Sequence, residues 1–238
     1  MKWPNWCRPD AMRLRHTMRY LLVSLTLAVA GQALAGTDED NRLWLNLTMQ
    51  GNLPANGWRW YAEIQPRFRE NAEHIDSLLL RPAINYKVTN KLSAWLGYGY
   101  IRNYLVNGDI RDEHRVWQQL LYAFEPIGST AVSARVRLEE RRVEQFEDTG
   151  YRLRQMLRVT HPLSGGWGVV AWDEVFFNTN HTDWGARSGF DQNRLFLGIS
   201  HDFSASVKTE WGYLNQYIRT STDDRMNHTL SGVLNLTF

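Results

Sequence analysis

The stretch Asn227-His228-Thr229-Leu230-Ser231-Gly232-Val233-Leu234-Asn235-Leu236-Thr237-Phe238 alternates between apolar and polar side chains. One register holds Leu230, Leu234, Leu236 and Phe238, and the other holds Asn227, Thr229, Ser231, Asn235 and Thr237. Successive side chains of a strand point to opposite faces of its sheet, so this stretch predicts a strand between lipid and a polar lumen. The final aromatic residue, Phe238, is similar to the signal that the barrel-assembly machinery reads, and we expect that machinery as a partner.

The same alternation recurs along the chain in segments that are long enough for tilted strands to cross a bilayer. We expect strands at residues 42–51, 57–69, 75–88, 91–104, 114–125, 130–143, 150–161, 167–178, 191–203, 206–218 and 226–238. The predicted fold is therefore an all-β, antiparallel transmembrane barrel of about 10 to 12 strands. Bacterial single-chain barrels have even strand numbers, which favours twelve strands, or ten if 42–51 is not a full wall strand.

The connections between these segments are of two kinds. Short turns are expected at residues 54–57, 89–90, 126–128, 164–166 and 203–204. Longer, more charged loops are expected at residues 106–113, 145–150, 178–189 and 219–226. This alternation is typical of outer-membrane barrels, in which short turns face the periplasm and longer loops face outward.

The amino-terminal segment predicts export. Arginines precede an apolar run at residues 20–30, and Ala33-Leu34-Ala35 follows it, which is the pattern of a cleaved secretory signal. We therefore expect a signal peptide at 1–35 and an outer-membrane barrel at 36–238. The apolar run is too short for a membrane-spanning helix, and the single cysteine, Cys7, precedes it and leaves with the signal. Met12 and Met18 are alternative starts that would give a signal of more ordinary length.

Composition restricts the partners. The formal net charge is +2 with no basic block, so we expect no nucleic-acid partner; outer-membrane lipid is the expected surrounding. No metal or other cofactor is expected, because the histidines are scattered without ligand spacing. Aromatic residues such as Trp58, Trp60, Trp211 and Tyr213 gather near strand ends, which is typical of an interfacial girdle rather than of a sugar-stacking surface.

The face that the alternation turns inward is rich in charge. The predicted lumen-lining residues are Glu63, Arg67, Arg69, Arg81, Arg135, Arg137, Glu139, Arg141, Arg152, Arg154, Arg158, Glu174, Arg194 and Glu210. Two interpretations follow. Arginine–glutamate networks could plug a lumen that is only just wide enough for side chains. Alternatively, the excess of arginine could line a narrow path for small anionic solutes, since guanidinium groups bind carboxylates and phosphates.

An enzyme is the alternative to a non-enzymatic barrel. Some outer-membrane barrels hydrolyse or transfer lipid acyl groups, and His181, Asp183 and Ser188 supply the residue types of such a catalytic triad. A triad is recognised by geometry, however, and these residues fall in one expected outer loop without a Gly-x-Ser-x-Gly elbow. We therefore expect no catalytic residues, with these three as weak candidates for phospholipid or lipopolysaccharide chemistry.

Several motifs carry a resemblance that extends over nearly the whole exported chain. They are Trp60-Tyr61-Ala62-Glu63-Ile64-Gln65-Pro66-Arg67-Phe68, Leu78-Leu79-Leu80-Arg81-Pro82, Glu113-His114-Arg115-Val116-Trp117-Gln118-Gln119, Tyr151-Arg152-Leu153-Arg154-Gln155-Met156, Phe190-Asp191-Gln192-Asn193-Arg194, Gly212-Tyr213-Leu214-Asn215-Gln216-Tyr217 and Met226-Asn227-His228. With these motifs the chain resembles the bacterial family known as domain of unknown function 2490. The resemblance implies an outer-membrane barrel, and it implies no particular activity.

Overall fold

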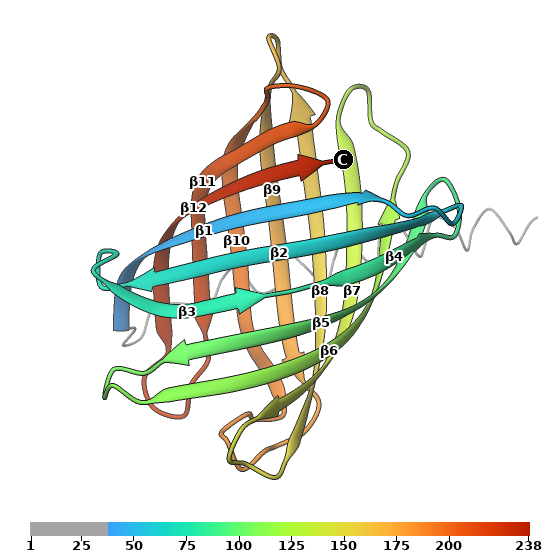
Figure 1. Cartoon of the computed structure of the whole chain (residues 1–238). Coiled ribbons are helices and arrows are strands. Elements are labelled where there is room, and N and C mark those ends of the chain that lie inside the picture. Colours follow the sequence, from blue (N-terminus) through green and yellow to red (C-terminus); the bar gives the residue numbers. More distant parts are fainter. Residues whose placement is uncertain (1–37) are drawn as a thin grey trace, which may run out of the picture. The chain divides into compact units, whose positions relative to one another are not determined.

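A computed structural model describes residues 38–238, which form a closed barrel of twelve strands (Figure 1). The predicted signal peptide at 1–35 lies outside these described residues. The strands are β1 (Asp38–Asn52), β2 (Trp58–Arg69), β3 (His74–Leu80), β4 (Ala83–Lys87), β5 (Leu92–Tyr104), β6 (Ile110–Ala123), β7 (Ala131–Val143), β8 (Thr149–Pro162), β9 (Trp167–Asn178), β10 (Gly189–Asp202), β11 (Val207–Ile218) and β12 (Arg225–Thr237). Within residues 38–238, no helix is long and apolar enough to cross a membrane. The predicted all-β barrel is confirmed.

Twelve strands fill eleven positions in the wall, because β3 and β4 are two parts of one position. Both pair with β2 on one side and with β5 on the other. The break falls at Arg81-Pro82, where proline has no N–H to donate to the ladder. Arg81 still exchanges backbone hydrogen bonds with Glu63, at 2.8 and 3.1 Å, so the wall stays continuous across the break.

The barrel closes through a parallel pair. β12 runs parallel to β1 from Asp38↔Arg225 to Gln50↔Thr237, whereas every other neighbouring pair in the described wall is antiparallel. An odd number of wall positions requires this, since the first and last strands then point the same way. The expectation of an even number of wall strands is therefore wrong. The predicted segment 42–51 is nevertheless a full wall strand, as its alternation indicated.

The strand connections define two ends of the barrel. We name the turn end by its connections at residues 53–57, 88–91, 124–130, 163–166 and 203–206, and the loop end by those at 70–73, 105–109, 144–148, 179–188 and 219–224. Except at 179–188, the two sets differ less in length than the sequence predicted, because the strands continue into the expected loops. Asp38 lies at the loop end, and Phe238 lies at the turn end.

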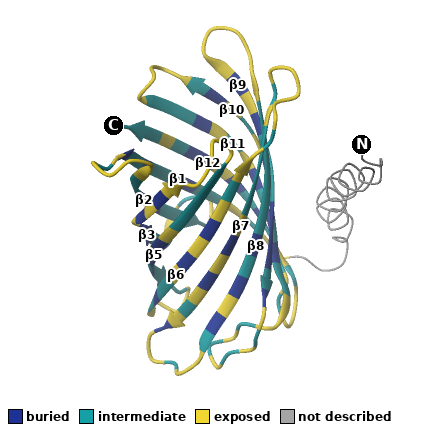
Figure 2. Cartoon of the chain, turned by 90° about the vertical axis from the view of Figure 1, so that its right-hand side faces the viewer, coloured by how far each residue is buried: buried dark blue, intermediate teal, exposed yellow. Residues whose placement is uncertain are grey.

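The two faces of the wall differ as the alternation predicted (Figure 2). Leu230 of β12 is 55% exposed, and the neighbouring Thr229 is fully buried. The lumen is not uniformly polar, however, since Trp44, Val170, Phe196 and Leu214 form a buried apolar cluster there, with Trp172 packed against it. The ring of Phe196 leaves no room for a side chain at Gly212, where a Cβ atom would lie 2.7 Å from the ring.

Phe238 contributes directly to closure of the wall. Its backbone N–H donates to the carbonyl of Gln50 in β1 at 2.9 Å, and its ring stacks on Trp60 at 5.9 Å between centroids. We predict that deleting Phe238 removes the heat-modifiable folded band from unboiled electrophoresis samples while secretion continues. The matched change Phe203→Ala, at another exposed aromatic residue of the turn end, should leave that band intact. A truncated protein that folds with normal yield would contradict the prediction.

Candidate functional site

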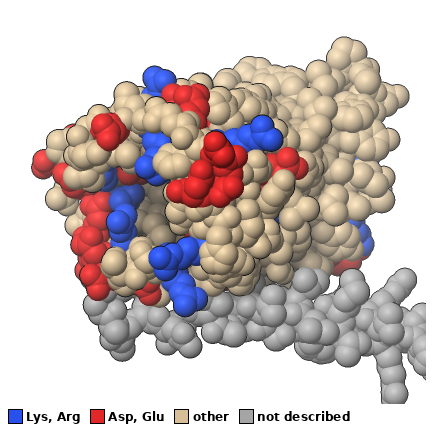
Figure 3. All heavy atoms as spheres, turned by 90° about the horizontal axis from the view of Figure 1, so that it is seen from below, with Lys and Arg blue, Asp and Glu red and all other residues tan. Residues whose placement is uncertain are grey.

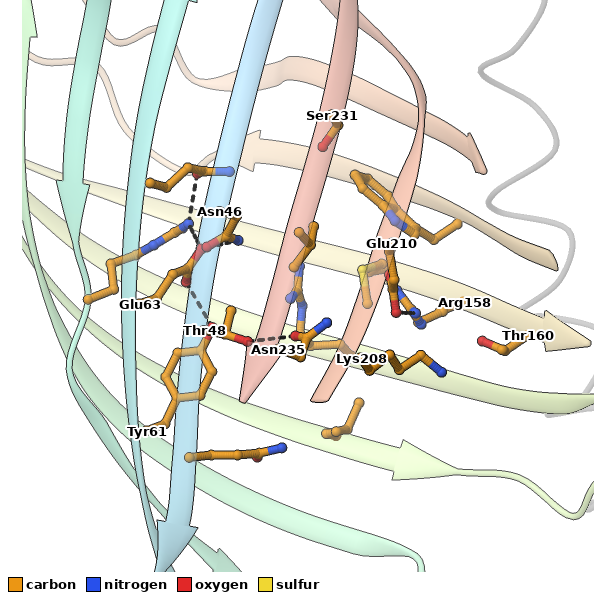
Figure 4. A pocket seen from close by; sticks show the side chains of 18 of the residues that line it. Asn46, Thr48, Tyr61, Glu63, Arg158, Thr160, Lys208, Glu210, Ser231 and Asn235 are labelled. Carbon is orange, nitrogen blue, oxygen red and sulfur yellow. Dashed lines mark hydrogen bonds and ion pairs between the residues drawn. The ribbon is translucent and has the colours of Figure 1, made fainter. Parts of the chain in front are cut away.

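The lumen contains a cavity of about 1060 Å³ that extends from the turn end toward the middle of the barrel (Figure 4). Asp202, Lys208 and Thr237 lie near its mouth, and Trp44, Arg67 and Arg194 line its deep part. Figure 4 shows Arg158 meeting Glu210 and Asn46 meeting Glu63 on its walls. This cavity is the candidate functional site because charged side chains from many strands converge on it.

A network of ion pairs binds three neighbouring strands inside the barrel. Glu139 of β7 accepts hydrogen bonds from Arg152 at 2.6 Å and from Arg154 at 2.5 Å, both on β8. Glu174 of β9 accepts from the same Arg154 at 2.8 Å and from Arg135 at 2.5 Å. These bidentate and shared contacts are the strong, charge-assisted kind, and they hold β7, β8 and β9 together.

The other inward glutamates are paired as well. Glu113 accepts from Arg115 at 2.7 Å and from Arg141 at 2.6 Å. Glu210 pairs with Arg158 at 2.5 Å, and Glu63 accepts from Arg81, from the Tyr61 hydroxyl and from Asn46. Each inward glutamate therefore has at least one arginine partner.

Two of the cavity arginines have no carboxylate partner among the described residues. The Arg67 guanidinium donates to Gln65 at 2.7 and 3.2 Å, and Arg194 donates to Gln192 at 3.3 Å. Both guanidinium groups lie against the indole of Trp44, at 3.8 Å for Arg67 and 4.9 Å for Arg194 from the ring centroid. These two cations repel one another, and Arg81 repels both. Asp76 near Arg67 and Glu174 near Arg194 offset part of this repulsion, but neither carboxylate forms an ion pair with these arginines.

The predicted lumen residues occupy three places. Those that line the cavity are Glu63, Arg67, Arg81, Arg135, Arg137, Arg154, Arg158, Glu174, Arg194 and Glu210. Glu139, Arg141 and Arg152 take part in ion pairs nearer the loop end. Arg69 lies at the loop-end rim, where it pairs with Glu70 at 3.0 Å.

Sequence reasoning missed several residues of the site. Glu113 was assigned to an expected loop, but it begins the inward register that continues through Arg115 and Trp117 of β6. Arg115, its partner in the same register, was omitted with it, so the excess of inward arginine over inward glutamate is unchanged. Gln65 and Gln192 were also missed as partners of Arg67 and Arg194. The alternation alone could have identified Glu113, since it shares the parity of Trp117.

The three weak catalytic candidates lie in the connection at 179–188. The Asp183 carboxylate accepts hydrogen bonds from the backbone N–H groups of Glu147, at 2.9 Å, and Asp148, at 3.3 Å. It thereby joins two loop-end connections. Within residues 38–238 no hydrogen bond links Asp183 to His181 or Ser188, and no group of metal-ligating side chains is present. Figure 3 shows the end where these connections lie, with acidic and basic side chains side by side on it.

Comparison with known proteins identifies the chain. Residues 41–227 match the family described as "Protein of unknown function (DUF2490)". The chain belongs to this family. One relative, an uncharacterized protein of Methylorubrum extorquens, is 37% identical over 223 residues, which cover 92% of this chain and 96% of the relative. The resemblance seen in the sequence motifs is thereby confirmed.

Two solved structures align with this DUF2490 barrel. A bacterial polysaccharide outer membrane secretin aligns with a TM-score of 0.50 at 9% identity, over 73% of this chain and 62% of the secretin. OmpT of Vibrio cholerae aligns with a TM-score of 0.38 at 14% identity, over 68% of this chain and 55% of OmpT. This chain spans less than two thirds of either solved chain. At these identities the secretin match demonstrates the barrel fold alone.

Proposed function

We propose that this DUF2490 protein is an outer-membrane barrel that provides a narrow, anion-preferring passage through its arginine-rich lumen. The observation that carries the proposal is the pair Arg67 and Arg194, two cations that line the cavity with no carboxylate partner among the described residues. Charge lining a narrow passage with low-dielectric walls focuses the potential and enriches the opposite ion. Rings of arginine or lysine are how pores select anions.

The arrangement of the ion pairs favours a passage over a plug. Glu139 joins neighbouring strands, as does Glu113, so their arginine partners lie along the wall. The ion pair between Arg158 of β8 and Glu210 of β11 joins strands that are farther apart, and it crosses part of the lumen near the turn end. A plug built from ion pairs would bring carboxylates to all of the central arginines, whereas Arg67 and Arg194 contact glutamine side chains instead.

Purified protein in a planar bilayer under a salt gradient tests the proposal. We expect small conductance steps with a reversal potential on the anion-selective side. A reversal potential on the cation-selective side contradicts the proposal, and so does the absence of any conductance in protein that shows the folded band. Hydrolysis of a phospholipid that is lost on His181→Ala would instead support the enzymatic alternative.

We also propose that the protein resides in the outer membrane with its loop end outward, after cleavage between Ala35 and Gly36. The barrel fold, the apolar outer face and the sequence of the amino-terminal segment support this. We predict that amino-terminal sequencing of detergent-extracted protein begins at Gly36, and that a tag inserted in the connection 179–188 is labelled on intact cells. Recovery of the protein from the soluble periplasm would contradict the prediction.

A further inference from the structure

We infer that Trp44, Arg67 and Arg194 form a discrete binding site for the carboxylate of a small aromatic anion. The inference rests on the proposed anion preference of the lumen and specifies where such an anion binds and what kind it is. Inorganic phosphate and simple aliphatic carboxylates are the alternative occupants that the experiment separates.

The geometry supplies two cations at one place. Arg67 comes from β2 and Arg194 from β10, and Trp44 of β1 lies between their strands in the wall. Both guanidinium groups lie against the Trp44 indole, and Arg194 also lies over the Phe176 ring at 4.7 Å; the proposed carboxylate binds beside the indole and accepts hydrogen bonds from both arginines. The stacking also restricts the arginine rotamers, which lowers the entropy that binding must remove.

Unused hydrogen-bond donors mark the same place. The indole Nε1 of Trp44 and the Nε atoms of Arg81 and Arg194 are buried without a hydrogen-bond partner among the described residues. Trp44 is 3% exposed, and Arg81 and Arg194 are each 9% exposed. Buried donors normally have partners, and one left without costs stability. All three residues line the cavity, and these donors would gain a partner if the side chains turned toward an acceptor that binds there.

The apolar cluster indicates which chemical group the ligand carries beside its carboxylate. Trp44, Trp172 and Leu214 line the cavity and belong to the cluster completed by Val170 and Phe196. Trp44 and Leu214 are already buried, but Trp172 is only half-buried, so an aromatic ring attached to the carboxylate would cover its exposed part, whereas an inorganic anion or acetate would not. Benzoate is the simplest probe that has both parts.

Isothermal titration calorimetry of the folded barrel in detergent tests the site. We expect saturable one-to-one binding of benzoate, weaker binding of acetate and of inorganic phosphate, and no binding of the cation benzylammonium. Arg194→Gln and Arg67→Gln should each weaken benzoate binding about tenfold or more, since a hydrogen bond to a charged group is lost. Trp44→Phe keeps an aromatic ring but removes the N–H donor, and it should weaken binding by a smaller factor.

Arg187→Gln is the matched control, because it makes the same charge change at an exposed residue of the connection 179–188. It should leave benzoate binding unchanged and also corrects for partition of benzoate into the micelle. Equal affinities for Arg194→Gln and Arg187→Gln would overturn the site, as would absence of saturable binding to the wild-type barrel. Tighter binding of acetate or phosphate than of benzoate would overturn the aromatic specificity.

Folding is checked by the heat-modifiable band. Arg194→Gln relieves repulsion with Arg67, and Glu174 opposite it keeps Arg135 and Arg154 as partners, so the variant should keep the folded band up to about the wild-type temperature. Loss of that band at lower temperature would indicate a structural role for Arg194 and overturn the inference. Binding without conductance would refute the channel alone, whereas anion-selective conductance without saturable benzoate binding would refute this site alone.

Discussion

Glu139→Gln is expected to lower the temperature at which the folded barrel unfolds by more than the neutralisation of any exposed carboxylate. Glu139 is 2% exposed and accepts hydrogen bonds from Arg152 and Arg154. A glutamine of the same size keeps the volume but removes the charge that both guanidinium groups share, so that Arg154 keeps only Glu174 and Arg152 keeps only Asp191. Removing one partner of a buried ion pair costs about 3 to 5 kcal/mol, because the remaining charge stays buried. The measurement is the temperature at which the fast-migrating folded band disappears on electrophoresis.

Two controls separate this effect from a general loss of charge. Glu147→Gln makes the same chemical change in the connection 144–148, where the residue is exposed and only its backbone N–H donates to Asp183. Lys208→Gln removes a partly exposed lysine that pairs with Asp202 at 3.2 Å near the turn end. Both should shift the unfolding temperature little. Shifts as large as that of Glu139→Gln would refute the buried role that we assign to this carboxylate.

The second large effect concerns selectivity. Combined Arg67→Glu and Arg194→Glu substitution is expected to change the current through the barrel from anion-preferring to cation-preferring. These arginines are chosen for charge reversal because neither forms an ion pair, although position 194 lies directly opposite Glu174 in the β9–β10 ladder. Arg135 and Arg137 are poorer choices, since the first pairs with Glu174 and the second lies 3.8 Å from Glu139. The reversal potential under a salt gradient gives the answer.

The control for charge reversal makes the same change in net charge at residues that lie outside the lumen. Arg187→Glu combined with Arg219→Glu alters two exposed residues of the loop-end connections. This pair should retain the wild-type preference for anions. If both double variants shifted the reversal potential equally, the lumen site would not determine selectivity, and the overall charge of the protein would.

The sequence was sufficient to predict the wall strands and which side chains of each strand point outward or inward. In β12 the alternation placed Leu230 in the outward register and Thr229 in the inward one, and their exposures agree with this. Such prediction works because a strand has a period of two and each barrel strand separates two different media. The expectation of an even number of wall strands could not be corrected from the sequence. The alternation in β1 and β12 is the same whether these strands pair in parallel or antiparallel.

The site was predictable only in part. Inward arginines follow from parity, but their partners depend on how strands distant in sequence are placed in the closed wall. Arg194 lies against Trp44 because β10 and β1 are separated by only β11 and β12 after closure. The apolar cluster was also missed, because its members come singly from β1, β9, β10 and β11, although the inward register of β9 is itself rich in apolar residues, with Val170, Trp172 and Phe176.

The parallel pairing of β1 with β12, which closes the barrel, affects the order in which strands pair during folding. Thr48 of β1 donates to Asn235 of β12 at 2.6 Å, a contact between residues that are 187 positions apart. All other wall strands pair with strands close to them in sequence, so hairpins can form progressively along the chain while this contact waits for the last strand. Loop-closure entropy and high contact order both make such a step slow. We therefore expect pairing of β1 with β12 to be the slow step of folding, during which the free edges of these two strands need protection from association with other chains.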